Sequence, residues 1–93
     1  MKRTLTQLPE NVPESIRKFA EGAPVYDSSC SKAARVYFLE KGEGFYLKHS
    51  PQDSLETEAL MGRFYHEKGL GPEVLSYMRE EGDWLLKIGR AHV

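Results

Sequence analysis

The stretch "RVYFLEKGEGFYLKHS", residues 35–50, predicts the centre of the fold. Its two flanks, "RVYFLE" (35–40) and "GFYLKH" (44–49), are rich in the β-branched and aromatic side chains that favour strands. The "KGEG" between them supplies glycines, which hairpin turns need because some turn residues adopt positive φ angles. The sequence therefore predicts an antiparallel β-hairpin.

The rest of the chain predicts two helices and three more strands around this hairpin. A short helix is expected within residues 11–22, and a long one from 53 to 68, where Asp53 and Glu56 would form a capping box. Further strands are expected at residues 24–29, 73–78 and 84–88. The predicted fold class is α+β, with a five-stranded, mainly antiparallel sheet, one long helix packed on it and a short N-terminal helix.

Size and composition indicate one small domain. The 93 residues allow a single modest core. The 13 basic and 14 acidic residues nearly balance, so charge gives no argument for a nucleic-acid or membrane partner. One cysteine cannot form an internal disulfide, and no apolar run approaches the roughly 20 residues that a membrane-spanning helix needs. We therefore expect a cytoplasmic protein with neither of these partners.

A lysine on the second strand of the hairpin is the main candidate for chemistry. Side chains alternate across a strand, so Tyr46 and Lys48 share one face. On the long helix Glu58 falls within an apolar stripe. If this stripe packs on the strand, Lys48 and Glu58 would neutralise each other's charge. The functional interpretation is that this lysine, oriented by the carboxylate, holds the phosphates of a nucleotide, and that the tyrosine offers a surface for the base. The alternative is a structural salt bridge beside a core tyrosine, and spacing alone does not decide between them.

The loop "SSCSKAA", residues 28–34, is a weaker candidate. Its small side chains and hydroxyl groups would let backbone N–H groups approach a phosphate, but it lacks the glycines of known phosphate-binding loops, and a plain connector is the alternative. Cys30 has no histidine near it in the sequence and is expected to be inert. The three histidines show no ligand spacing, so no metal site is expected.

The segments "SSCSKAARVYFLEKGEGFYLKHS", "LETEALMGRFYHEKGLGPEVLSY" and "GDWLL" together resemble the N-terminal lobe of aminoglycoside 3′-phosphotransferases, which have a protein-kinase-like fold. The resemblance covers residues 23–86 and implies that ATP is bound. It implies that Lys48 contacts the α- and β-phosphates, that Glu58 orients this lysine, and that Tyr46 stacks on adenine. In the loop, it implies that the hydroxyl of Ser31 contacts the nucleotide. On the helix, Glu56 is a weaker alternative to Glu58 as the partner of the lysine.

The resemblance also implies parts that these residues do not contain. Relatives carry a catalytic aspartate in an HGD-type loop, the Mg²⁺ ligands and the aminoglycoside pocket in a C-terminal lobe, whereas "HGD" is absent here. We therefore expect residues 1–86 to be an incomplete kinase-like lobe that is inactive alone. The ending "IGRAHV" resembles the translation of a common sequencing adapter, so residues 87–93 are expected to be a non-native tail.

Two other functions remain open from the sequence. One is the lobe of a related small-molecule kinase that acts on choline, homoserine or a sugar amine. The other is a non-catalytic α+β interaction module. A lobe parted from its partner is expected to expose an apolar patch near "DWLLK", residues 83–87, whereas a self-contained module is expected to have no large one.

Overall fold

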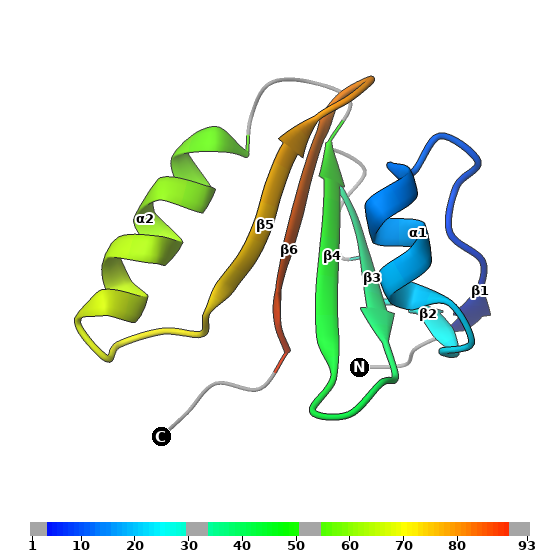
Figure 1. Cartoon of the computed structure of the whole chain (residues 1–93), viewed down its shortest axis with the longest axis horizontal. Coiled ribbons are helices and arrows are strands. Elements are labelled where there is room, and N and C mark those ends of the chain that lie inside the picture. Colours follow the sequence, from blue (N-terminus) through cyan, green and yellow to red (C-terminus); the bar gives the residue numbers. More distant parts are fainter. Residues whose placement is uncertain (1–3, 30–33, 51–54, 90–93) are drawn as a thin grey trace.

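The computed structural model describes residues 4–29, 34–50 and 55–89 of the chain (Figure 1). Its elements run in the order β1 (Thr4–Thr6), α1 (Glu14–Ala20), β2 (Val25–Asp27), β3 (Arg35–Leu39), β4 (Phe45–Ser50), α2 (Glu56–Glu67), β5 (Val74–Arg79) and β6 (Asp83–Ile88). The α+β class predicted from the sequence is confirmed.

The strands of the described residues form one antiparallel sheet of six strands in the order β1-β2-β3-β4-β6-β5. The predicted hairpin is present as β3 and β4, with Tyr37 opposite Leu47 and Phe38 opposite Tyr46. Its turn requires a glycine at Gly44, because φ there is +90° and a Cβ atom would lie 2.8 Å from the Phe38 ring. The prediction of five strands was wrong, since β1 adds a three-residue strand too short to show alternation.

The two helices cover opposite faces of this sheet, which Figure 1 shows with α1 and α2 at its two sides. Residues of β6 alternate between the two cores: Trp84 and Leu86 face α1, and Leu85 faces α2. The first core is the larger and contains Val12, Ile16, Ala20, Val25, Tyr37, Leu39, Leu47, Trp84 and Leu86. Among the described residues, the buried members of the second core are Leu55, Ala59 and Leu85.

The start of α2 differs from the prediction. The sequence placed it at Asp53, which lies outside the described residues, but the helix begins at Glu56 with Leu55 at the capping position. Glu56 therefore occupies the first helical position and not the third that a capping box requires, and its carboxylate pairs with Arg79 at 2.7 Å. The carboxylate of Asp83 instead accepts the Leu55 N–H at 3.0 Å.

Exposed apolar side chains in the C-terminal half of the described chain lie on α2, on β5 and in the segment between them. Residues Asp83 to Leu86 are all buried, because β6 lies between β4 and β5. Three exposed apolar side chains nevertheless lie beside this strand, because Met61, Tyr65 and Leu70 line one cavity with Leu85 and Lys87. The exposed large apolar side chains in the C-terminal half of the described chain are Leu60, Met61, Phe64, Tyr65, Leu70 and Leu75.

Candidate functional site

Lys48 and Glu58 form an ion pair between β4 and α2. The Lys48 Nζ atom lies 2.8 Å from Glu58 Oε1. Alternation on β4 points Lys48 toward the face that α2 covers, and Glu58 lies in the first turn of α2, where the helix dipole favours a carboxylate. The side chains are 30% and 34% exposed, so the pair borders solvent and a polar ligand has access to it.

Lys87 is a second cation at Glu58 that the sequence did not reveal. Its Nζ atom lies 3.4 Å from Glu58 Oε2, and in the sheet register it sits opposite Tyr46. Partial burial acts to raise the pKa of Glu58, but the hydrogen bond and charge of Lys48, with the charge of Lys87, outweigh it and hold this pKa below its ordinary value. The Glu58 carboxylate is thus held ionised between two lysines.

Lys87 belongs to the segment that the sequence assigned to a non-native tail. In the structure Lys87 and Ile88 pair with β4, and the Gly89 N–H donates to the Gly44 carbonyl at 2.8 Å. Residues 90–93 lie outside the described residues. The origin of this segment stays a prediction.

Tyr46 lies on the same face of β4 as Lys48, two residues before it. Its ring is half-buried and packs at a tilt on Phe38 of β3, with the ring centres 5.2 Å apart. On the other side it neighbours Lys87 of β6. The structure therefore brings Tyr46, Lys48 and Glu58 to one side of the sheet, and their contact with a nucleotide stays a prediction.

Ser31, the fourth candidate residue, lies outside the described residues, as does Cys30. The stem of their loop is described: the Ser29 N–H donates to Asp27 Oδ1 at 2.9 Å, and the Val36 N–H donates to Ser29 Oγ at 2.9 Å. The Ser29 hydrogen bonds and the adjacent Arg35 lower the pKa of Asp27, with which Arg35 forms an ion pair. The stem is thus tied to the sheet close to β3.

Glu56 is not a partner of Lys48. Its carboxylate pairs with Arg79 of β5, while Glu58 takes the lysine. The rival assignment of Glu56 is therefore wrong. The reason is that the late start of α2 points Glu56 toward the β5–β6 hairpin.

A cavity of about 380 Å³ opens beside the ion pair, between α2, the segment after it and the last two strands. Glu58 and Lys87 are its charged lining residues, and Leu85 and Val74 are among its apolar ones. The volume falls within the range of about 300–1,000 Å³ that small-molecule sites occupy. This cavity is therefore the one relevant to chemistry at Glu58.

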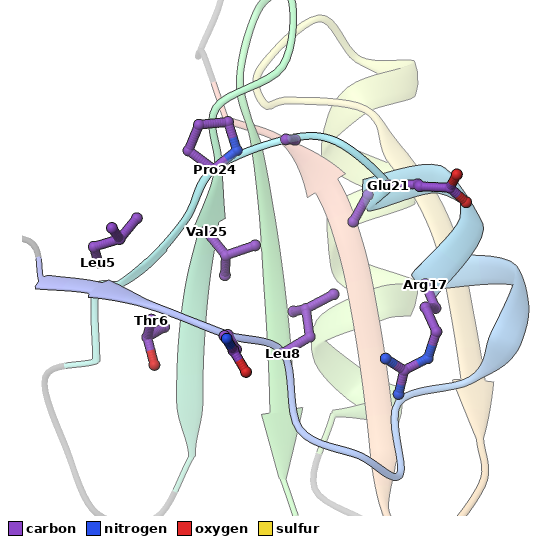
Figure 2. A pocket seen from close by; sticks show the side chains of 10 residues that line it. Leu5, Thr6, Leu8, Arg17, Glu21, Pro24 and Val25 are labelled. Carbon is purple, nitrogen blue, oxygen red and sulfur yellow. The ribbon is translucent and has the colours of Figure 1, made fainter.

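A larger cavity of about 540 Å³ lies at the far end of the sheet, among β1, α1 and β2 (Figure 2). Its charged lining residues are Arg17 and Glu21. The Arg17 guanidinium already donates to the Pro9 and Glu10 carbonyls, at 3.3 and 2.9 Å. Tyr46, Lys48 and Glu58 do not line this cavity. Although it is the larger of the two, it is therefore separate from the ion pair.

Acid should weaken the fold partly through Glu58. Because the folded pKa of Glu58 is lowered, its stabilisation is present above the unfolded pKa of about 4.3 and disappears as pH falls through the folded pKa. We expect Glu58→Gln to cost up to about 1 kcal/mol at pH 7 and nothing at the acid end. Urea unfolding of both proteins at a series of pH values measures this difference. In a Lys48→Ala background the same substitution should have less effect, and an equal effect would contradict the assignment.

Comparison with known proteins first gives a class for this domain: the chain is similar to a phosphotransferase. Over 79 residues, 84% of the chain, it is 39% identical to a protein of Lactococcus lactis subsp. lactis (strain IL1403) named "Probable aminoglycoside 3'-phosphotransferase". The chain spans about 30% of the length of that relative. No protein-family model matches the chain, and no solved structure matches it significantly. The similarity confirms the resemblance stated from the sequence and is consistent with a fragment of that family.

The described part of the chain has two helices, and neither is long and apolar enough to cross a membrane.

Proposed function

We propose that the chain is the N-terminal, nucleotide-binding lobe of a kinase-like aminoglycoside O-phosphotransferase. The whole enzyme would transfer the γ-phosphoryl group of ATP to a hydroxyl group of an aminoglycoside, which inactivates the antibiotic. The observation that carries this proposal is the 2.8 Å pair of Lys48 and Glu58 beside Tyr46, in a chain 39% identical over 79 residues to a named phosphotransferase. A cytoplasmic location, where ATP is available, is part of the proposal.

Lys48 is suited to phosphate because its partner leaves it spare donors. A lysine ammonium group has three N–H donors, and the contact with Glu58 accounts for one of them. Among the described residues no further acceptor is recorded for it, and charge-assisted bonds to phosphate oxygens are about twice as strong as neutral ones. Glu58 then keeps the lysine in place while the nucleotide binds.

We assign to Tyr46 a contact with the base of the same nucleotide. Residues two apart on one face of a strand lie about 7 Å from each other, so the ring and the ammonium group lie side by side along β4. An aromatic ring beside a cation matches a ligand that carries a flat base at one end and phosphates at the other. We assign to Ser31 a hydroxyl contact with the same ligand.

ATP and Mg²⁺ are the cofactors of this proposal. In such an enzyme Mg²⁺ would neutralise the negative charge of the phosphate groups. The described residues fit the nucleotide better than the metal, because no three histidine, cysteine or acidic side chains among them cluster as metal ligands. We assign the metal ligands and the aminoglycoside pocket to the rest of the enzyme, since the chain spans about 30% of its relative.

Calorimetric titration of the chain with ATP and Mg²⁺ tests the proposal. Losing a hydrogen bond to a charged group costs about 1.5–3 kcal/mol, so Lys48→Ala should weaken binding about 10- to 100-fold. The variant is expected to fold, because a half-exposed pair contributes only about 0–1 kcal/mol. Lys18→Ala removes an exposed lysine of α1 and serves as the matched control, with affinity unchanged. Equal affinity of the wild type and Lys48→Ala would contradict the proposal, and no binding by either would favour an interaction module.

A further inference from the structure

Asp83 is a fully buried carboxylate at the start of β6, with an exposed fraction of 0%. Three donors surround it. Its Oδ2 atom accepts the Leu55 N–H at 3.0 Å and the Tyr77 hydroxyl at 3.1 Å, and its Oδ1 atom accepts Arg79 Nε–H at 3.3 Å. A buried carboxylate needs such partners, because an unpaired buried charge is costly. Asp83 therefore links the β5–β6 hairpin to the first residue before α2.

Apolar packing holds α2 only weakly. Of its twelve residues Ala59 alone is buried, and four large apolar side chains on it are exposed. Leu55, just before its first turn, packs on Leu85 in the small core. The polar links from the start of α2 to the β5–β6 hairpin are the Asp83 bond to Leu55 and the pair of Arg79 with Glu56 at 2.7 Å. Arg79 also contacts Asp83, so one polar cluster on the hairpin holds both Leu55 and Glu56 at the start of the helix.

The same turn of the helix carries Glu58. It follows Leu55 by three residues, which is about 4.5 Å along a helix axis and brings both residues to one side of the helix. A displacement of the helix start therefore moves Glu58 by a similar distance. The bond from Lys48 to Glu58 is 2.8 Å long, and hydrogen bonds are lost beyond about 3.5 Å.

We propose that Asp83 is a positioning residue for the Lys48–Glu58 pair: by holding the N-terminus of α2 it sets the distance from Glu58 to the lysine. Its significance for nucleotide binding rests on the proposed function above. Asp83 itself contacts no described candidate residue, and its effect passes through the helix. The position of Glu58 relative to Lys48 on β4 thus depends on β5 and β6, through the cluster of Asp83, Tyr77 and Arg79.

The pKa of Glu58, measured by NMR titration of carboxyl carbons, tests this role. Asp83→Ala should separate Glu58 from Lys48 and raise the Glu58 pKa toward its ordinary value. Direct electrostatics predicts the opposite sign, because removal of a negative charge lowers the pKa of a neighbouring acid. Asp83→Asn retains an acceptor for the Leu55 N–H and should raise the pKa less.

Ile16→Val is the control for a purely structural role, since Ile16 lies in the larger core on the other face. It should lower the melting temperature and leave the Glu58 pKa of the folded protein unchanged. If Asp83→Ala does not fold, Asp83→Asn and Arg79→Gln carry the test. A Glu58 pKa that stays at the wild-type value or falls in the folded variants would overturn the proposal, as would an equal rise in Ile16→Val.

Titration of the same variants with ATP and Mg²⁺ separates this inference from the proposed function. We expect Asp83→Asn to weaken ATP binding about tenfold, as when a supporting residue no longer orients a ligand-contacting one. A raised Glu58 pKa in a protein whose wild type binds no ATP would leave the positioning role intact and remove the nucleotide function. An unchanged Glu58 pKa, together with ATP binding that depends on Lys48, would support the nucleotide function and overturn the positioning role of Asp83.

Discussion

Replacing Trp84 by alanine should lower the free energy of unfolding by about 3–5 kcal/mol, close to the total stability of a small domain. Trp84 has an exposed fraction of 0%, and its ring stacks on His49 of the neighbouring strand with 3.7 Å between ring centres. Its indole N–H also donates to the Glu80 carbonyl at 2.8 Å. Alanine would leave a cavity in the larger core and an unpaired acceptor. Urea unfolding followed by circular dichroism measures the loss.

Trp84→Phe is the matched control for the ring. Phenylalanine keeps an aromatic face against His49 but loses the donor to Glu80 and part of the buried ring volume, so the loss should be smaller, about 1–3 kcal/mol. A loss below about 1 kcal/mol for Trp84→Ala would show that this side chain does not support the core as described.

Replacing the next residue, Leu85, by alanine should lower the free energy of unfolding by a similar amount, about 2–5 kcal/mol. The destabilised part of the molecule should differ, however. Leu85 is 1% exposed and belongs to the small core beneath α2, which has only two other buried members. Its loss should free the helix before it weakens the sheet. Hydrogen exchange of backbone amides measures this: protection should fall first in α2 and remain in α1.

Leu86→Ala is the control for that distribution. Leu86 is 4% exposed and points to the opposite face, into the core that α1 covers. Its replacement should reduce protection in α1 and the strands it contacts, and spare α2. If both variants lose protection in the same amides, the two cores act as one unit and the separation described for β6 is wrong.

Local patterns in the sequence were enough to predict the hairpin and the meeting of Lys48 with Glu58. A hairpin depends on its own turn, and the two charged residues are ten positions apart, so alternation on one strand and spacing on one helix brought them together. β1 was missed because three residues show no period. The roles of Ser31 and Asp53 concern positions outside the described residues.

The sequence patterns did not predict contacts between segments that are far apart in the chain. Asp83 directly precedes the strand predicted at residues 84–88, and nothing in its neighbourhood indicates that it accepts the N–H of a residue 28 positions earlier. Lys87 reaches Glu58 across 29 positions only because β6 lies beside β4. The order of strands in a sheet follows from the packing of the whole chain, and periodicity within one strand does not encode it.

The inner position of β6 has a consequence for synthesis on the ribosome. β1 to β4 pair in the order in which they are made, but the sheet is completed only when the last strand inserts between β4 and β5. Until Ile88 has left the ribosomal exit tunnel, the nascent chain displays β4 as an open edge that carries Phe45 and Leu47. Such edges recruit other strands, so the nascent chain is open to aggregation through β4 during this interval.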